Sequence, residues 1–418
     1  MGFALRAGQQ RVNNWNSWIC SNWLSAVLLM ETDENRRRAT VHKIMRALDN
    51  FIDPYPADGG CDEGPSYWGK AGASLFDNLE LFHSASNGQI DFYAEPLIQD
   101  IGRFVYRVHI DGDYYINFAD APALVYPDGV LVYRYGERIR DPQMMQHGLW
   151  LAQRQQLAER GYGANGDIRQ NNFQRLLRGL FSLADLPATP VGLPQGRDVW
   201  LPVIEVMVAR DSAGNADGFT LAAKGGHNAE SHNHNDIGNF VVYRDGKPLL
   251  VDAGVETYTA KTFGPNRYDI WTMQSAYHSL LPTVDGVMQS PGREYAAADV
   301  SYRADDAVAE LSLEMAGSSS ARSQDRRLET DCPPGARRGG DVQRRLRAER
   351  ASRRSDCLPR HPLRRGHQPA GACKTERAGH PRRARLRGWT GGVRPGHLHR
   401  RSGNSHPDRR AYGRRVGK

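Results

Sequence analysis

The spacing of apolar residues changes twice along the chain and divides it into three parts. Between residues 33 and 52 the apolar residues recur every three or four positions, the period of an amphipathic helix, and Asp33 is suited to cap its start. From Ile204 onward apolar and polar residues alternate, as they do in strands. Beyond about Ala321 neither period persists. The first two parts therefore fold differently, and the third lacks the apolar residues that a core requires.

Helical hairpins are predicted for residues 1–190 and an antiparallel β domain for residues 198–320. Further helices are expected at residues 67–84, 91–109, 141–160 and 171–184, with an aromatic loop at 114–135 and a Pro/Gly-rich linker at 186–196. Asp245-Gly246 stands between two apolar runs and predicts a β-hairpin. Because helices and strands are segregated along the chain, the pattern favours an α+β fold over a βαβ sheet.

The net charge of +8 is distributed unevenly. Residues 322–418 hold 28 Lys and Arg against 8 Asp and Glu, about +20, which leaves about −12 on residues 1–321. This change follows directly after an expected strand, and the Arg-rich runs resemble a gene read out of frame, so we expect a frameshift near residues 317–322 and a disordered tail. A basic arm that binds nucleic acid is the alternative. A strand-rich continuation in another reading frame would decide between them.

Cysteine usage and hydropathy give few further constraints. The five cysteines contain no CxxC pair and predict no disulfide framework. The apolar run Trp23–Met30 is too short to span a bilayer, and no basic segment typical of a signal peptide precedes it. We expect neither a membrane span nor an export signal, so the sequence leaves the localisation open.

The strongest chemical signal is the segment His232-Asn-His234-Asn-Asp236. Side chains two positions apart in an extended segment share a face, so both histidines are expected to point the same way. Pairs of imidazoles suit zinc when a carboxylate completes the site. Asp252 ends an apolar strand, where a carboxylate is costly unless it is paired or bound to metal, and His278 follows further along the chain. A polar loop that happens to contain two histidines is the alternative.

The order H-N-H-N-D, then V-D-A-G, then Y-H-S-L and V-D-G resembles the C-terminal β domain of the heparinase II/III family of polysaccharide lyases. The resemblance covers about residues 198–315. It implies a zinc ion with a structural role, held by His234, Asp252 and His278, and it implies that His232 faces the substrate.

Two segments of the helical half resemble the cleft of the same family's α/α toroid. They are N-N-W-N, from Asn13 to Asn16, and E-G-P-S-Y-W-G, from Glu63 to Gly69. The family has a long helical region before N-N-W-N, whereas only about a dozen residues precede it in this sequence. The resemblance thus implies an incomplete toroid followed by a truncated β-sandwich. We expect such a chain to be weakly active and poorly soluble, because small displacements of catalytic groups are costly.

The implied reaction is β-elimination at a uronic acid. The C5 proton is acidic only when the adjacent carboxylate is neutralised, a role predicted for Asn13. A base then takes that proton and an acid protonates the leaving oxygen. Either Tyr67 performs both steps, or His232 is the base and Tyr67 the acid. The predicted substrate-binding residues are Asn14, Asn16, Glu63, Arg267, Tyr258 and Tyr268.

Two other functions remain open from the sequence. A zinc hydrolase is one, since HxHxD also opens metallo-β-lactamase-type sites, although there a histidine follows the aspartate and here Ile237 does. A carbohydrate-binding remnant without catalysis is the other. The expected partner is a glycosaminoglycan-like or alginate-like uronate polymer or oligomer, and nucleic acid is not expected to bind.

Overall fold

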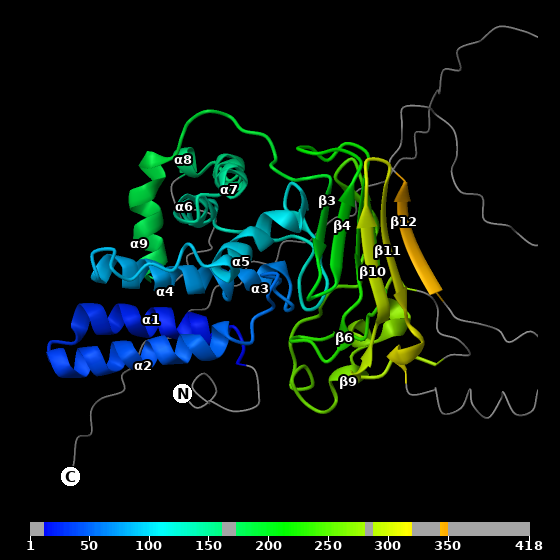
Figure 1. Cartoon of the computed structure of the whole chain (residues 1–418), viewed down its shortest axis with the longest axis horizontal. Coiled ribbons are helices and arrows are strands. Elements are labelled where there is room, and N and C mark those ends of the chain that lie inside the picture. Colours follow the sequence, from blue (N-terminus) through cyan, green and yellow to red (C-terminus); the bar gives the residue numbers. More distant parts are fainter. Residues whose placement is uncertain (1–11, 161–172, 281–286, 320–342, 350–418) are drawn as a thin grey trace, which may run out of the picture. The chain divides into compact units, whose positions relative to one another are not determined.

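The computed structural model describes residues 12–160, 173–280, 287–319 and 343–349 (Figure 1). Its helices are α1 (Trp15–Met30), α2 (Glu34–Ile52), α3 (Pro65–Trp68), α4 (Gly72–Ala85), α5 (Pro96–Arg107), α6 (Gly129–Arg138), α7 (Pro142–Arg154), α8 (Leu157–Arg160) and α9 (Phe173–Ser182). Except for the small β1–β2 pair between α5 and α6, the antiparallel sheets follow these helices along the chain, which confirms the predicted α+β class. Among the described residues, no helix combines the length and hydropathy needed to cross a bilayer.

Helix α2 forms as its apolar period predicts. The Asp33 side chain accepts a hydrogen bond from the Arg36 backbone N–H at 2.9 Å, which satisfies one of the free donors at the helix start. Ile44, Leu48 and Phe51 are buried on one face. This face packs into the main hydrophobic core of the helical part.

The predicted aromatic loop at residues 114–135 is wrong in its second half, where helix α6 begins at Gly129. Asp128 caps this helix by accepting a hydrogen bond from the Leu131 N–H at 3.0 Å. Three consecutive residues, Val130 to Val132, are all buried. Valine and tyrosine, which make up much of this helix, are weaker helix formers than leucine or alanine, and packing of the helix overrides that local preference.

The predicted helix at residues 67–84 is also divided, into the short helix α3 and the longer α4. Ala71, which precedes α4, has a ψ of −85°, outside the helical range. The break sets Tyr67 on its own short helix between Gly64 and Gly69.

Helices α6 and α7 approach each other through glycines. A Cβ atom on Gly148 would lie 2.2 Å from the backbone nitrogen of Tyr133, and one on Gly129 would lie 2.5 Å from that of Ala152. Contacts this short cannot exist between real atoms, so a larger residue would force the two helices apart. The glycines therefore set the helix spacing here.

The β domain contains a five-stranded and a three-stranded antiparallel sheet, with small two-stranded sheets beside them. The larger has the order β3 (Asp198–Leu201), β4 (Val206–Arg210), β5 (Phe219–Lys224), β7 (Phe240–Arg244) and β8 (Lys247–Leu250), and the smaller consists of β10 (Ala298–Ala304), β11 (Val308–Glu314) and β12 (Gln343–Glu349). The two-stranded sheets pair β1 (His109–Asp111) with β2 (Tyr114–Tyr115), and β6 (His227–Asn228) with β9 (Gly292–Ala296).

The two larger sheets pack face to face as a sandwich, and both faces of strand β4 are buried. Met207 and Ala209 pack in one cluster with Leu311 of strand β11. Val206 and Val208 point to the other face and join the core that contains the helical residues. Successive side chains of β4 therefore point into two different hydrophobic clusters, and neither face of the strand is turned to solvent.

The hairpin predicted at Asp245-Gly246 is confirmed. The two residues have φ values of +48° and +70°, and Arg244 pairs with Lys247 across the turn. These are the left-handed angles of a two-residue type I′ turn. Strand β12, at residues 343–349, pairs with β11 and lies beyond residue 320, where the basic tail is predicted to begin. Most of that tail, and the frameshift proposed for it, lies outside the described residues.

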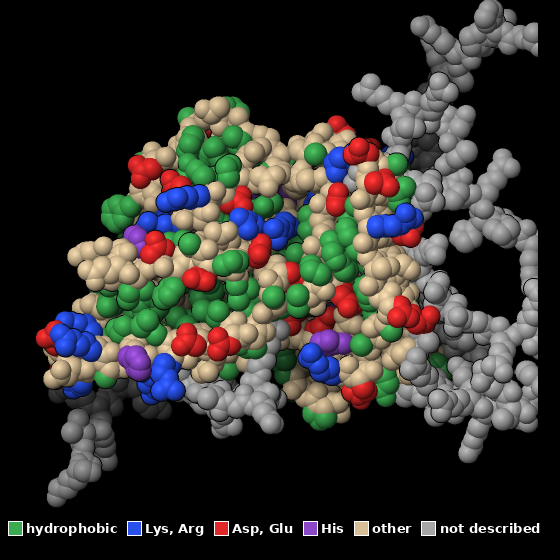
Figure 2. Space-filling view, viewed as in Figure 1, with side chains coloured by type: hydrophobic (Ala, Val, Ile, Leu, Met, Phe, Trp, Pro, Cys, Tyr) green, Lys and Arg blue, Asp and Glu red, His purple; other side chains and the backbone are tan. Residues whose placement is uncertain are grey.

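Helix α1 exposes apolar side chains. Leu29 and Met30 are 73% and 78% exposed, and Trp15 is 52% exposed. Figure 2 shows hydrophobic side chains gathered over this helix on the face in view. Exposed apolar surface of this kind can favour self-association. The poor solubility expected from the sequence stays a prediction.

The close contact of α6 with α7 generates a stability prediction. Gly148→Ala should lower the free energy of unfolding by about 1–3 kcal/mol, because the added methyl group overpacks the helix crossing. The measurement is chemical denaturation followed by circular dichroism. Gly192→Ala is the matched control, since its nearest neighbour would be 3.9 Å from the new Cβ. Equal stability of the two variants would contradict the prediction.

Candidate functional site

One buried carboxylate, that of Asp120, connects the predicted site residues. Its Oδ2 accepts hydrogen bonds from His232 Nδ1 at 2.6 Å and from the Tyr258 hydroxyl at 2.8 Å. Its Oδ1 accepts from His234 Nε2 at 2.9 Å and from the Arg267 guanidinium at 3.0 Å. Asp120 lies in the loop between β2 and α6, whereas all four partners lie in the β domain. The carboxylate therefore fastens the helical part to the site loops.

The charge of Asp120 is stabilised by these partners. Burial by itself would raise its pKa, but the hydrogen bonds from His232 and His234 and the charge of Arg267 outweigh that effect and lower it well below its ordinary value. Asp120 is thus ionised at neutral pH. An ionised carboxylate can only accept hydrogen bonds, so each histidine must direct an N–H toward it.

Tyr67 and His232 meet at this site from separate parts of the chain. Their ring centroids are 4.3 Å apart, and the Tyr67 hydroxyl makes a short hydrogen bond to the hydroxyl of Tyr258. His232 has a φ of +57°, which is uncommon for a residue other than glycine. Backbone strain of this kind concentrates at functional sites, where the surroundings hold it in place.

Burial raises the pKa of Tyr67. The negative charges of Asp120 and Glu63 act in the same direction, while the hydrogen bond with Tyr258 and the charge of Arg267 oppose them. The described residues thus keep the phenol protonated at neutral pH. That state suits a proton donor, and it does not supply the lowered pKa that a tyrosine base would need.

Glu63 and Asn14 form a buried pair beside His232. Asn14 Nδ2 donates a short hydrogen bond to Glu63 Oε2, and the same oxygen lies 3.7 Å from His232 Nε2. The Oδ1 atom of Asn14 is buried and has no hydrogen-bond partner among the described residues. Two predicted substrate-binding residues thus lie next to the imidazole nitrogen that Asp120 leaves free.

Asn13 and Asn16, from the same N-N-W-N segment, are placed differently. Asn13 is exposed, and its Oδ1 accepts a hydrogen bond from the Trp15 N–H at 3.1 Å. Asn16 is buried within helix α1, where its Oδ1 lies 3.9 Å from the Cys20 sulfur that donates to it. Neither makes a described hydrogen bond to Tyr67 or His232, and the roles assigned to them stay predictions.

Arg267 and Tyr268 are held by protein contacts. Beyond its bond to Asp120, Arg267 donates through Nε to the carbonyl of Asn233 at 2.9 Å and through NH1 to that of Thr262 at 2.7 Å. The Tyr268 hydroxyl accepts from Asn233 Nδ2 at 2.9 Å. These contacts engage three of the five N–H donors of Arg267 and give it a positioning role.

Exposed aromatic rings surround His232. Phe263 is 66% exposed and meets His232 edge to face at 5.3 Å between centroids. Tyr258, 41% exposed, packs against Phe263 in the same way at 5.1 Å. Aromatic faces of this kind can pack against a sugar ring. Phe263 is not among the predicted site residues, because a lone phenylalanine in a polar segment gives no signal.

The three predicted metal ligands, His234, Asp252 and His278, lie together. One ligand atom from each lies within 4.8 Å of the others, and all three side chains are buried. His278 Nδ1 contacts Asp252 Oδ2 at 2.6 Å, and Asn239 donates to the same oxygen. His234 Nδ1 and His278 Nε2 are buried without a partner among the described residues. A cation would satisfy both nitrogens.

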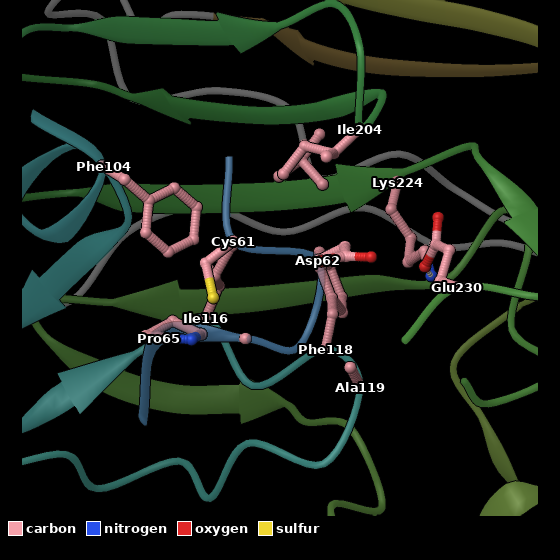
Figure 3. A pocket seen from close by; sticks show the side chains of 12 residues that line it. Cys61, Asp62, Pro65, Phe104, Ile116, Phe118, Ala119, Ile204, Lys224 and Glu230 are labelled. Carbon is pink, nitrogen blue, oxygen red and sulfur yellow. Dashed lines mark hydrogen bonds and ion pairs between the residues drawn. The ribbon is translucent and has the colours of Figure 1, made fainter. Parts of the chain in front are cut away.

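A second buried ionic cluster lies next to the site. Lys224 Nζ contacts Glu230 Oε2 and Asp236 Oδ1, each at 2.8 Å. Figure 3 shows Lys224 and Glu230 side by side at one end of a cavity of about 20 Å³ that Asp62 also lines. Burial raises the pKa of Glu230 to about 7 in spite of the attraction of Lys224. A cavity of this size holds about one water molecule.

Asp120 and the cluster around Lys224 are not among the site residues predicted from the sequence. Asp120 follows the apolar run Ile116–Ala119, broken only by Asn117. A carboxylate after an apolar run is the same signal that singled out Asp252. It was available for Asp120, whereas nothing in the local sequence of Lys224 indicates that the residue is buried.

Comparisons with known proteins agree with this geometry. Residues 198–349 match the family model described as heparinase II/III-like, C-terminal. No curated protein matches the chain. The match extends through strand β12 and contains His232 together with all three metal-ligand candidates.

Solved structures share the fold. A heparinase III structure is 14% identical, with a TM-score of 0.50 and 74% of this chain and 44% of its own length covered. A heparan sulfate lyase from Pedobacter heparinus is 14% identical, with a TM-score of 0.51, and the match covers 75% of this chain and 43% of that structure. A second heparinase III is 16% identical, with a TM-score of 0.53, and the match covers 74% of this chain and 42% of that structure. The chain thus spans less than half the length of these structures. Residues 198–349 thus match the heparinase II/III-like C-terminal domain, and the described part of the chain shares its fold with these structures.

Proposed function

We propose that the chain acts as a lyase on uronic-acid glycans, cleaving them by β-elimination to leave a 4,5-unsaturated uronate end. The observation that carries this proposal is the contact between Tyr67 of the helical part and His232 of the β domain, with 4.3 Å between their ring centroids. β-Elimination requires that a proton is taken from C5 and that another is given to the leaving O4, which two adjacent proton-transfer groups can do. The substrate class is a glycosaminoglycan-like or alginate-like polymer or oligomer.

His232 is the proposed base and Tyr67 the proposed acid. Since Asp120 occupies His232 Nδ1, the proton of a neutral imidazole resides there and leaves a lone pair on Nε2. That nitrogen can take the C5 proton of the uronate. The raised pKa of Tyr67 keeps its proton available for the leaving oxygen. The free Nε2 of His232 and the protonated phenol of Tyr67 favour a mechanism with His232 as base and Tyr67 as acid over one in which Tyr67 performs both steps.

Asn13 remains our choice for neutralising the uronate carboxylate. Its side chain is exposed, and its Nδ2 donates to no atom of the described residues. Asn14 has already given one of its two N–H donors to Glu63. An amide that donates to the carboxylate stabilises the charge that develops at C5.

The residues at the metal site fit a zinc ion. Two buried imidazole nitrogens without partners and a buried carboxylate are the donor set that zinc prefers. We propose that His234, Asp252 and His278 hold it and that its role is structural. Bound zinc would supply positive charge and cross-link the three segments, with His232 two residues from one ligand. The proton transfers are assigned to protein groups alone.

Replacement of the proposed acid tests the function directly. In Tyr67→Phe, kcat/KM should fall by about 10²- to 10⁴-fold, the usual contribution of general acid–base catalysis. The measurement is the ultraviolet absorbance of the unsaturated uronate during incubation with glycosaminoglycan and alginate oligosaccharides. Tyr126→Phe, at an exposed tyrosine outside the site, should keep the rate.

Three results would contradict the proposal. One is an unchanged rate in Tyr67→Phe. Another is saturated product, which would indicate a hydrolase. The third is glycan binding without any chromophore from the unaltered chain, as a binding remnant would give.

Removal of the Asp120 charge should weaken both fold and function. Asp120→Asn should lower the free energy of unfolding by about 3–5 kcal/mol, because Arg267 is left buried without its counter-charge. Asp113→Asn, which removes an exposed pair with Arg154, should cost at most about 1 kcal/mol. Denaturation curves of the two variants give the comparison. An equal loss would show that Asp120 is not a special partner.

Metal content tests the zinc proposal. The full chain, as purified without chelator, should hold about one zinc ion, and His278→Ala should hold almost none, since three protein ligands are few for a tetrahedral ion. Elemental mass spectrometry is the measurement. His83→Ala, at a histidine on helix α4 outside the site, should retain the zinc. Zinc retained by both variants would rule out this ligand set.

A further inference from the structure

A carboxylate on helix α4, Glu80, is surrounded by three arginines from helices α6 and α9. Arg138 Nε donates to Glu80 Oε1 at 2.6 Å, and Arg178 NH1 donates to Oε2 at 3.2 Å. Arg134 makes a short ion pair with the same Oε2. The Tyr93 hydroxyl donates to Oε1 at 2.6 Å. Each oxygen thus accepts two hydrogen bonds, and Glu80 has no capacity left for further donors.

Three guanidinium groups contact the carboxylate of Glu80. Although burial alone would raise the pKa of Glu80, the two arginines of α6 and the Tyr93 hydroxyl lower it, so the group is ionised. Guanidinium groups remain charged under all ordinary conditions. Two further carboxylates lie nearby: Glu137 lines the same cavity, and Asp91 attracts Arg138.

Burial and repulsion act together at Arg178. Burial and the charges of Arg134 and Arg138 lower its pKa, in spite of the attraction of Glu80. Guanidinium groups held this close together repel one another. A bound anion would relieve that repulsion.

The cluster borders an open cavity of about 530 Å³. Its lining residues are Glu80, Arg134, Glu137, Arg138, Arg178 and Ser182. Of these, Arg138 is 38% exposed at its side chain, and its described hydrogen bond uses Nε alone. Its NH1 and NH2 groups have no hydrogen-bond partner among the described residues. Two parallel N–H donors of this kind match two oxygens of one anion.

We propose that this cavity binds a tetrahedral oxyanion of the sulfate or phosphate type, either as a free ion or as a group carried by a glycan. A tetrahedral anion presents acceptor oxygens in several directions, which suits guanidinium groups arriving from two helices better than a planar carboxylate does. None of the lining residues belongs to the site around Asp120. The inference is therefore independent of the proposed lyase activity.

Titration of the full chain with inorganic sulfate tests the proposal, at constant ionic strength maintained with chloride. Calorimetry should show saturable binding, and the midpoint of thermal unfolding should rise with sulfate concentration. Arg138→Gln should weaken binding about tenfold or more, the effect of losing charge-assisted hydrogen bonds. Arg154→Gln, at an arginine of helix α7 whose partner is the exposed Asp113, should bind sulfate normally.

Arg138→Lys provides a second variant if the glutamine variant folds poorly. It keeps the charge and loses the paired donors, so its affinity should also fall. A sulfated oligosaccharide and its desulfated counterpart distinguish the two sources. Preference for the sulfated sugar over free sulfate indicates a group carried by a glycan, and equal affinity indicates the free ion.

Two results would overturn the proposal. One is the absence of saturable binding of both sulfate and the sulfated sugar, and the other is equal binding by Arg138→Gln, Arg138→Lys and the unaltered chain. Tyr67→Phe should bind sulfate with unchanged affinity, because Tyr67 does not line the cavity. Failure of the anion site and failure of the lyase proposal are thereby separable.

Discussion

The ionised carboxylate of Asp120 is the constraint on which the arrangement of the site depends. It is fully buried, so its charge is tolerated only with partners, and it has four: His232, His234, Tyr258 and Arg267. Because a carboxylate can only accept, it determines which nitrogen of each histidine carries a proton. His232 is left with a free Nε2 beside Glu63, and His234 is left with a free Nδ1 among the metal-ligand candidates. One side chain thus sets the tautomers of both the proposed base and a proposed metal ligand.

Buried charges also need partners of opposite charge in the clusters around Lys224 and Glu80, but the two clusters differ in the partners they have. Lys224 has two carboxylate partners, and burial leaves one of them, Glu230, with a pKa near 7, so that this cluster approaches neutrality by holding a proton. Around Glu80 the partners are arginines, which cannot release protons. Two N–H groups of Arg138 there remain without a partner among the described residues and border an open cavity. These unused donors distinguish the Glu80 cluster from the Lys224 cluster, whose charged groups bind one another.

Sequence patterns predicted the elements whose signals are local and failed where packing decides the structure. Helix α2 and its cap at Asp33 followed from spacing, and the Asp245-Gly246 hairpin from turn chemistry, because both signals are local. Helix α6 was missed because its valines and tyrosines are weak helix formers that tertiary packing holds in a helix. The sequence predicted strand β4 correctly, but it did not show that both faces of the strand are buried, each against a different layer. Tertiary context decides such cases, and a sequence window does not contain it.

The site residues were predictable to the extent that their spacing in the sequence reflects shared geometry. The segment of His232 and His234 is not extended as expected, since His232 has a φ of +57°, yet both side chains contact Asp120. Asp252 lies two residues beyond strand β8 and is buried with partners. Residue type and short spacing were enough to bring out their chemistry. Asp120 is 112 residues away from His232, and its importance lies entirely in partners that the fold brings to it. An argument from burial cost would nevertheless have applied to it, since a carboxylate behind an apolar run must find donors somewhere. Such residues can be identified from sequence as needing partners even when the partners themselves cannot be named.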